Sequence, residues 1–420
     1  MSKTIGVART VRLAVLFLAF VLFVPPAGLS AFDFGLLLNQ RGWLGGDAGD
    51  EGTRGEYEAS LMPRLSILVG DSIDLFFSAS LKAIYRNVGV GDGWAFVPEL
   101  LRNEFVWSFD NIDLRMGRMA FADPMGIVAT GLFDGASGSL HTMMGTFSAG
   151  VWYTGLLYKN RARISMTADD ATAMQAEVDW GNFADTYFAS RRLMVALNWE
   201  HPSVADLFGL GVALVAQADL NNADNTHHSQ YLIAKAFVPI QRFIFELGGA
   251  LETAQVTDGA DFRVGLAGDI AAHWMPPVPF HSMVSFAGRF TSGRAETGPL
   301  SAFTPITALP HGSVLQAPIS GLSMLSLGYT ARLHRTFSAS LAVSHFVRSD
   351  RGTYMGYPLG GEPSDNYFLG TEFFGRAIWS PFSDISLNLG VGAFLPALGN
   401  VEPEAGARWR AEMSLALMFR

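Results

Sequence analysis

A first group of residues that could support metal binding or catalysis lies around position 225. His227 and His228 stand close to Asp224, and imidazole and carboxylate groups are common metal ligands. Adjacent histidines in a loop are more often solvated, and Asp219, Asn221 and Asp224 lack the spacing and the glycine of a calcium-binding loop. We therefore predict no metal site in this stretch.

A catalytic pair and a nucleotide-binding loop are indicated just as weakly. Ser344 and His345 are adjacent, but neighbours in a strand point to opposite faces, so they cannot share a proton. Gly89, Gly91 and Gly93 lie close together, yet no predicted helix follows them, and a hairpin loop explains them better. The sequence thus predicts no enzyme and no cofactor, so the elements that carry these residues must serve another purpose.

The composition indicates a folded chain in an apolar environment. Of its 420 residues, 49% are hydrophobic and only 16% are charged, against about 25% charged residues in soluble domains. There is no cysteine, which excludes disulfide scaffolds and cysteine-ligated metal sites, and the net charge of −9 disfavours a nucleic-acid partner. A membrane is the environment that fits these values.

The N-terminal region has the three parts of a secretory signal peptide. Three basic residues precede an uncharged apolar stretch at 13–24, and prolines and small residues follow at 25–31. The apolar stretch is shorter than the roughly 20 residues of a membrane-spanning helix, so an N-terminal anchor is the less favoured alternative. We predict that residues 1–31 are removed and that 32–420 form the mature domain, with a net charge of −9 − 3 = −12.

Beyond this region the apolar residues follow the alternation of β-strands. Prolines interrupt the longer apolar runs at 270–288 and 297–331, so neither is expected to span a membrane as a helix. Over 409–419 the odd positions are apolar, whereas the even positions include Arg410 and Glu412. Such a strand rises about 33 Å, or about 25 Å when tilted, which matches the apolar band of an outer-membrane barrel. A β-sandwich would also bury one face of each strand. The same pattern recurs at 243–252, 262–274 and 385–395.

The connections between these segments favour the barrel, because barrels in the outer membrane alternate long loops with short turns. We expect long loops near 40–54, 87–97, 119–134, 220–228, 254–259, 293–320, 349–365 and 396–406. We expect short turns near 70–71, 110–111, 200–205, 239–240, 275–279, 334–335 and 381–383. The predicted fold is all-β, a transmembrane antiparallel up-and-down β-barrel of about 18 strands with both termini on the periplasmic side. Residues 136–183 are ambiguous, and 16 strands is the alternative.

One region resembles a known family. The segments 113–121 (DLRMGRMAF) and 131–135 (GLFDG), with Asp123 and Pro124 between them, resemble a strand, loop and strand start of bacterial outer-membrane porins of the alginate-export and OprD-like kind. The resemblance implies an 18-stranded barrel that passes small solutes. The resemblance does not imply alginate as the transported solute, because a pore for a polyanion would need a strongly basic lumen and this chain is acidic.

The C-terminal strand is similar to the insertion signal of outer-membrane barrels, which implies the barrel assembly machinery as a partner. That signal usually ends in an aromatic residue, whereas Arg420 follows Phe419 here.

Loops must provide any narrowing, because a barrel of 16 to 18 strands encloses an aqueous channel. The loop at 120–134 is apolar, and we expect it to fold into the lumen as a constriction. Packing on the barrel rim or on a neighbouring subunit is the alternative. The long loop at 293–320 is the second candidate. The predicted constriction residues are Phe121, Asp123, Phe133 and Asp134.

The inward positions of the strands carry charges of both signs. Opposed charged rings would orient polar solutes and tune ion selectivity, whereas the alternative is that they form ion pairs within the wall. The net charge of the mature chain suggests a mild preference for cations. The predicted pore-lining residues are Asp113, Arg115, Arg242, Glu246, Glu252, Arg263, Asp269, Arg289, Glu372, Arg376, Arg410 and Glu412.

These patterns together predict a porin-like channel of the outer membrane for passive diffusion of small polar solutes or ions. Two alternatives remain. One is a transporter of hydrophobic molecules that uses apolar inward positions such as Phe346 and Phe374, and the other is a surface-displayed structural or adhesion barrel. The expected partners are the lipid bilayer, the assembly machinery and small solutes, and three copies could associate as a homotrimer.

Overall fold

The computed structural model describes nine stretches of the chain, and its first strand begins at Leu29. The predicted signal peptide at 1–31 therefore lies almost wholly outside the described residues, as do Asp224, Gly89, Gly91, Arg420 and large parts of the loops predicted at 349–365 and 396–406. The described residues are 29–47, 52–87, 93–221, 226–256, 262–278, 280–295, 298–349, 367–398 and 406–419.

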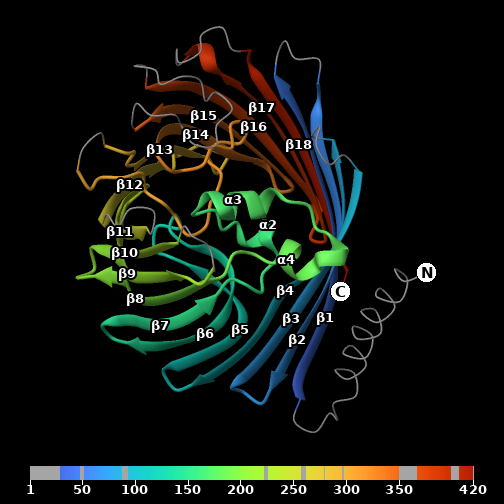
Figure 1. Ribbon diagram of the computed structural model, residues 1–420, viewed down its shortest axis with the longest axis vertical. Helices are drawn as coiled ribbons and strands as arrows, with labels where there is room; N and C mark the ends of the chain where they lie inside the picture. Colours follow the sequence, from blue (N-terminus) through green and yellow to red (C-terminus); the bar gives the residue numbers. More distant parts are fainter. Residues whose placement is uncertain are drawn as a thin grey trace.

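Eighteen strands form one closed antiparallel sheet (Figure 1). Each strand pairs with its neighbours in sequence, and β1 pairs with β18 to close the barrel, from Leu36 opposite Phe419 to Asp47 opposite Arg408. The predicted strand number is confirmed, and the alternative of 16 strands is not. The strands are β1 (Leu29–Asp47), β2 (Arg54–Val69), β3 (Ile73–Asn87), β4 (Gly93–Phe109), β5 (Ile112–Ala122), β6 (Thr130–Thr142), β7 (Gly145–Tyr153), β8 (Arg192–Val204), β9 (Phe208–Asp219), β10 (His227–Ile240), β11 (Phe243–Val256), β12 (Phe262–Trp274), β13 (Met283–Thr291), β14 (Leu322–His334), β15 (Phe337–Arg348), β16 (Phe368–Phe382), β17 (Ile385–Leu395) and β18 (Arg408–Phe419).

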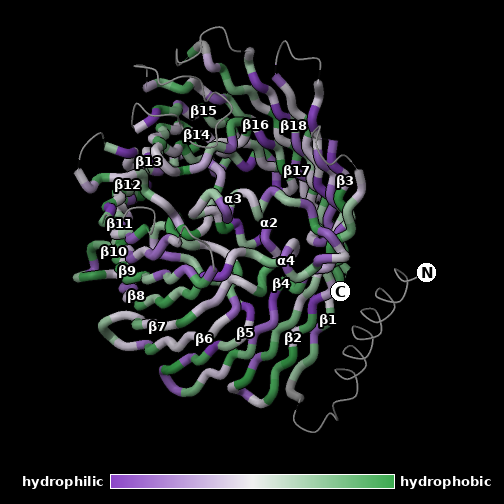
Figure 2. Tube along the Cα trace, viewed as in Figure 1, coloured by the Kyte–Doolittle hydropathy of each residue, from purple (hydrophilic) through white to green (hydrophobic). Residues whose placement is uncertain are grey.

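The alternation of the sequence becomes an outer and an inner face of the wall. Hydrophilic and hydrophobic residues alternate along the strands in Figure 2. On β18, Trp409 and Met413 are exposed on the outer face, while Arg410 and Glu412 between them form an ion pair on the inner face. An apolar outer face around a charged interior is what a barrel in a lipid bilayer requires.

The region predicted as ambiguous, 136–183, contains the second half of β6, the nine residues of β7 and most of a helical connection. We call residues 154–191, between β7 and β8, the helical segment. It includes α2 (Lys159–Ala162), α3 (Ala168–Gln175), the 3-10 helix η1 (Trp180–Asn182) and α4 (Phe183–Tyr187), and a further 3-10 helix, η2 (Pro396–Leu398), follows β17. Figure 1 shows α2, α3 and α4 within the ring of strands. None of the helices in the described stretches has the length and apolar character needed to cross a membrane.

The β5–β6 hairpin bends away from β4 part of the way up the wall. Asn103 opposite Arg118 is the last pair between β4 and β5, although β4 continues along β3 as far as Gly93. Gly117 lies at this point with φ of 110°, and a Cβ there would stand 2.0 Å from the carbonyl oxygen of Asn103. Only glycine combines this backbone conformation with so close an approach, so Gly117 permits the hairpin to turn inward.

Candidate functional site

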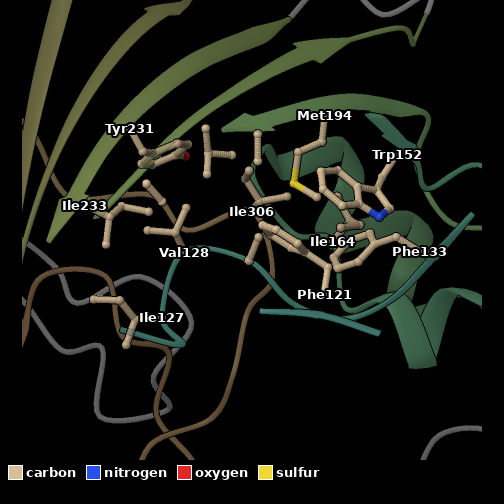
Figure 3. Close-up of a cluster of buried hydrophobic side chains, with 14 of the residues drawn as sticks. Phe121, Ile127, Val128, Phe133, Trp152, Ile164, Met194, Tyr231, Ile233 and Ile306 are labelled. Atoms are coloured by element: carbon tan, nitrogen blue, oxygen red, sulfur yellow. The ribbon is translucent and has the colours of Figure 1, made fainter. Parts of the chain in front are cut away.

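Three inward-folded connections fill part of the barrel interior. They are the helical segment, residues 123–129 between β5 and β6, which we call the β5–β6 loop, and residues 292–321 between β13 and β14, which we call the long loop. Their apolar side chains pack against small and apolar residues of β8 to β12 (Figure 3). Phe121 and Phe133, two of the predicted constriction residues, belong to this cluster and are 8% and 1% exposed.

Asp123, the third predicted constriction residue, turns back onto its own loop. Its carboxylate accepts the backbone N–H groups of Met125, Gly126, Val128 and Ala129 at 2.8 to 2.9 Å. Burial raises the pKa of Asp123. The side chain therefore shapes the β5–β6 loop from within instead of facing water in the lumen.

Asp134, the fourth predicted constriction residue, lies on the face of the β5–β6 hairpin that points away from the interior cluster. Its neighbour Phe133 points into the interior cluster, and successive strand residues face opposite sides. Arg118 holds the Asp134 carboxylate with two hydrogen bonds of 2.8 and 2.9 Å. The same guanidinium donates to the carbonyl oxygens of Leu100 on β4 and Leu156 in the helical segment at 2.6 and 2.9 Å. Asp134 and Arg118 thus connect β6, β5, β4 and the helical segment.

Two predicted pore-lining glutamates anchor the long loop. Glu252 on β11 accepts the N–H of Thr304 at 2.6 Å. Glu372 on β16 accepts the N–H groups of Ser313, Val314 and Leu315 at 2.7, 3.0 and 2.9 Å. Both glutamates face the interior, but the loop covers them, so they hold the loop and do not contact lumen water.

Backbone hydrogen bonds join the three connections to one another. Ile306 of the long loop donates to the carbonyl of Val128 in the β5–β6 loop at 2.8 Å, and both side chains lie in the cluster of Figure 3. Ala308 donates to the carbonyl of Arg163 in the helical segment at 2.9 Å. The three connections therefore form one interior body.

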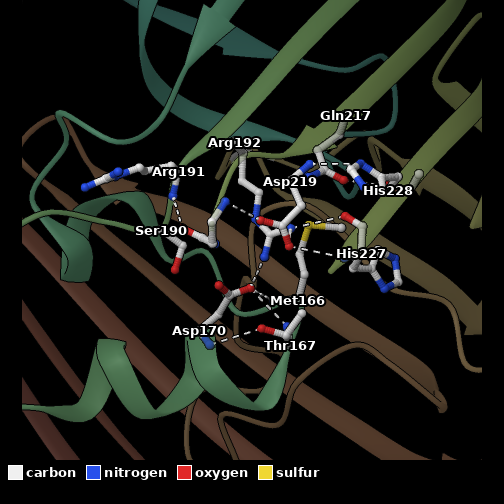
Figure 4. A network of polar contacts seen from close by, with 12 residues as sticks. Met166, Thr167, Asp170, Ser190, Arg191, Arg192, Gln217, Asp219, His227 and His228 are labelled. Carbon is white, nitrogen blue, oxygen red and sulfur yellow. Dashed lines mark hydrogen bonds and ion pairs between the residues drawn. The ribbon is translucent and has the colours of Figure 1, made fainter. Parts of the chain in front are cut away.

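Arg192 fastens this body to the wall. The side chain is fully buried on β8, and its Nη2 and Nη1 lie 2.5 Å from the carboxylates of Asp170 on α3 and Asp219 on β9 (Figure 4). Nη1 also donates to the carbonyl of His227 at 3.1 Å. The hydroxyl of Thr167 caps α3 by accepting the N–H of Asp170. Charge and capping together fix the helical segment inside the barrel.

A second contact between the long loop and the wall involves a neutral histidine. Arg289 Nη1 on β13 lies 2.8 Å from Nε2 of His311, whose Nδ1 is 3.1 Å from the carbonyl of Leu309. Since arginine donates, Nε2 must accept and the proton must sit on Nδ1. Burial and the charge of Arg289 lower the pKa of His311 to about 4.

Three inward arginines of the wall are not covered by the interior body. The inward side chains of Arg41, Arg115 and Arg376 are 55%, 48% and 45% exposed. Their acidic neighbours Glu58 and Glu104 are only 7% and 1% exposed. The three most exposed charges of these pairs are therefore basic, although Asp47 and Glu412 on the same inner face are also 41% and 27% exposed.

The other predicted pore-lining residues occupy inner positions of the wall, mostly in local ion pairs. Asp113 contacts His141, Glu246 contacts Lys235 and His273, Asp269 lies between Lys235 and Arg289, and Glu412 contacts Arg376 and Arg410. Arg263 is half-buried on the inner side of β12. Arg242 differs, because β10 extends to Ile240 and places it in the exposed turn before β11.

Sequence reasoning missed Arg41, Arg118 and Arg192, and also Arg102, which forms an ion pair with Glu104. The alternation could have placed Arg41 inward, but the partners of Arg118 and Arg192 come from distant connections. Within the described residues, no group of three or more histidine, aspartate or glutamate side chains is arranged to hold a metal ion.

The fold and its charged interior define an 18-stranded β-barrel of the outer-membrane porin type. No family model and no curated protein matches the chain. Solved structures do share its fold. OccK2 (OpdF) of Pseudomonas aeruginosa has a TM-score of 0.61 and 11% identity, with 93% of this chain and 99% of that chain covered. OccAB1 of Acinetobacter baumannii has a TM-score of 0.60 and 10% identity, with 93% of this chain and 97% of that chain covered. OprD of Pseudomonas aeruginosa has a TM-score of 0.57 and 10% identity, with 92% of this chain and 93% of that chain covered. The likeness supports the OprD-like part of the predicted resemblance at the level of fold.

Proposed function

We propose that the chain is an outer-membrane channel for the passive diffusion of small polar solutes. The observation that carries this proposal is the exposure of Arg41, Arg115 and Arg376, which point into a closed barrel and yet remain about half exposed. Side chains can be exposed inside a closed wall only where water fills the space. Solutes would follow this path down their gradients, and the basic lining would favour anions.

The structural relatives support the same reading. OprD is an outer membrane protein, and OccK2 has been solved in complex with glucuronate, a small carboxylate. A small anionic solute would fit the exposed arginines of this chain. A closer relation to the alginate-export porins stays a prediction.

Single-channel recording tests the proposal. The refolded mature chain should give stepwise openings in a planar bilayer, and a salt gradient should give a reversal potential of the sign expected for anion preference. A folded, heat-modifiable barrel without openings would contradict the channel.

The interior body is the proposed constriction, with Phe121 and Phe133 as its apolar support. A chain in which the long loop and the β5–β6 loop are shortened to tight turns should conduct more in the open state. Unchanged conductance would remove the constriction from the proposal.

The first alternative, a transporter of hydrophobic molecules, has less support. Phe346 and Phe374 do face inward, but they are 0% and 8% exposed, and Phe346 packs with Leu315 of the long loop. They hold the loop in place and leave no open apolar surface. A displayed adhesion barrel would require a partner that binds the outer loops in place of throughput.

Several further predictions accompany the proposed location. Residues 1–31 would direct secretion, although a cut after Ala31 would remove the first residues of β1. The barrel assembly machinery would insert the chain through its C-terminal strand, and association of three copies and the absence of enzymatic activity also stay predictions.

A further inference from the structure

The place where β4 and β5 separate is a break in the barrel wall. Above the pair of Asn103 and Arg118, residues 93–102 of β4 pair with β3 alone, while residues 118–122 of β5 pair with β6. β4 therefore has a free edge over this length. An unpaired edge cannot face lipid, because nothing in hydrocarbon satisfies its backbone groups.

Two side chains and a proline satisfy or remove backbone hydrogen-bonding groups on this edge, which no neighbouring strand pairs. The hydroxyl of Tyr187 donates to the carbonyl of Pro98 at 2.6 Å, and Arg118 donates to the carbonyl of Leu100. The N–H and C=O of a strand residue point to the same side, so the missing N–H of Pro98 also belongs to the free edge. The edge is thus closed by contacts that can release without breaking the sheet.

The break lies at the depth of the membrane. Trp94 and Phe96 are exposed on the outer face above it, and Trp107 and Phe109 are exposed below it. From Phe96 to Trp107 a tilted strand rises about 28 Å, which is close to the height of the apolar band between two aromatic girdles. The edge at Pro98 and Leu100 lies between these girdles.

Behind the break stands an apolar cluster on the inner side of the wall. It contains Ile84 of β3, Val97 of β4, and Tyr158 and Tyr187 of the helical segment, each no more than 6% exposed. The two tyrosine rings lie 5.0 Å apart. Phe183 packs against the same cluster, and its ring stacks on that of Tyr187. Tyr187, a member of this cluster, itself contacts the free edge through the carbonyl of Pro98.

We propose that this break is a lateral port, closed by the helical segment, through which an aliphatic chain from the membrane reaches the apolar cluster inside the barrel. Arg118 is the latch, since it joins β4, Asp134 on β6 and Leu156 on the segment. The port adds a route between membrane and interior to the channel along the barrel axis. It rests on the proposed membrane location, but it does not require that the axial channel conducts.

Photolabelling from the lipid phase tests the port in the full mature chain. One probe is a phospholipid with a diazirine at the end of one acyl chain, and the second is a dodecanoate with the same group. Labelled residues are mapped by mass spectrometry. The port predicts label on Val97, Ile84 and Tyr158 in addition to the outward-facing Phe96 and Leu341.

The two probes distinguish a phospholipid chain from a free fatty acid. Label on the cluster from both probes means that any acyl chain enters, and label from dodecanoate alone means that only single-chain amphiphiles enter. Label confined to Phe96 and Leu341 would overturn the port. Absence of label at these two outer positions would instead contradict the membrane location.

Two variants sharpen the test. Arg118→Met removes the latch and should raise labelling of Tyr158 and Val97 several-fold. Tyr187→Phe removes one hydroxyl, is expected to fold normally, and should raise it by a smaller factor. Arg332→Met, at an exposed position of β14 whose guanidinium contacts the carbonyl of Arg335, is the matched control and should change nothing. Equal labelling in all three variants would refute the role of these contacts.

Discussion

The backbone N–H of Leu315 in the long loop donates to Oε2 of Glu372 on β16 at 2.9 Å. The N–H groups of Ser313 and Val314 bind the same carboxylate, so one wall residue holds the tip of the loop. Hydrogen bonds to a charged acceptor contribute about 1.5–3 kcal/mol each, so the docked loop depends strongly on this charge.

We expect Glu372→Gln to loosen the long loop. The amide keeps one oxygen acceptor but loses the charge, and its NH2 group faces three donors. Open-channel current should become noisier, with a larger maximal conductance, in single-channel recordings. Glu412→Gln, which alters an ion pair with Arg376 away from the loop, should leave the noise unchanged. If the open-channel noise of Glu372→Gln equals that of the wild type, contacts other than Glu372 are sufficient to hold the long loop.

The exposed arginines should set the charge selectivity. Replacing Arg41, Arg115 and Arg376 together by glutamine should move the reversal potential in a salt gradient toward cation preference, because three exposed positive charges are removed while their acidic partners Glu58, Glu104 and Glu412 remain. Arg242→Gln, in the exposed turn before β11, is the control. The idea fails if the wild-type channel prefers cations from the outset.

Acidification should weaken the docking of the long loop through His311. Its pKa is lowered to about 4 in the docked state against about 6.5 in a free state, so the free state binds more protons between these values. Docking is therefore fully stable above about pH 6.5 and loses stability as the pH falls toward 4. Conductance at pH 4.5 should exceed that at pH 7, and His311→Asn should reduce this difference.

Removal of Arg192 should destabilise the whole interior body. Arg192→Ala would leave the carboxylates of Asp170 and Asp219 buried without their partner, a change that typically costs about 3–5 kcal/mol. The temperature at which the folded band converts to the unfolded band in heat-modifiability gels should fall. The same change at its exposed neighbour Arg191 should have little effect.

Gly117 should not tolerate a side chain. Gly117→Ala would place a Cβ against the carbonyl oxygen of Asn103 in a backbone conformation of φ 110°, at a cost of order 1–3 kcal/mol from conformation alone. Refolding yield should drop sharply. Gly268→Ala, where the nearest atom to the new Cβ is 3.6 Å away, should refold normally.

The alternation of residue types was sufficient to predict the wall. On β18 it placed Trp409 outside and Arg410 inside, because a strand with two different environments must alternate. It also indicated that the loop after β5 would turn inward, since Phe121 and Phe133 would sit poorly in water. These are local signals that short stretches of sequence contain.

The interior body was less predictable because its contacts join distant residues. Nothing near Glu372 indicates that it will bind the backbone of Leu315, and the burial of Glu58 beside the exposed Arg41 depends on how the connections pack. One signal was available, since Thr167 and Asp170 form a capping box at the start of α3. It would have revealed a helix in the region 136–183, but not its attachment to Arg192.

The pairing of β1 with β18 makes closure of this barrel a separate step of its folding. Each of the other strand pairs joins neighbours in sequence, and most of them can form as local hairpins, whereas Leu36 meets Phe419 only when both ends of the chain are present. Loop-closure entropy makes such a contact slow. Until it forms, the first and last strands expose open edges that could pair with other chains. Sheltering these two edges is therefore the task that any assembly factor must perform for this chain.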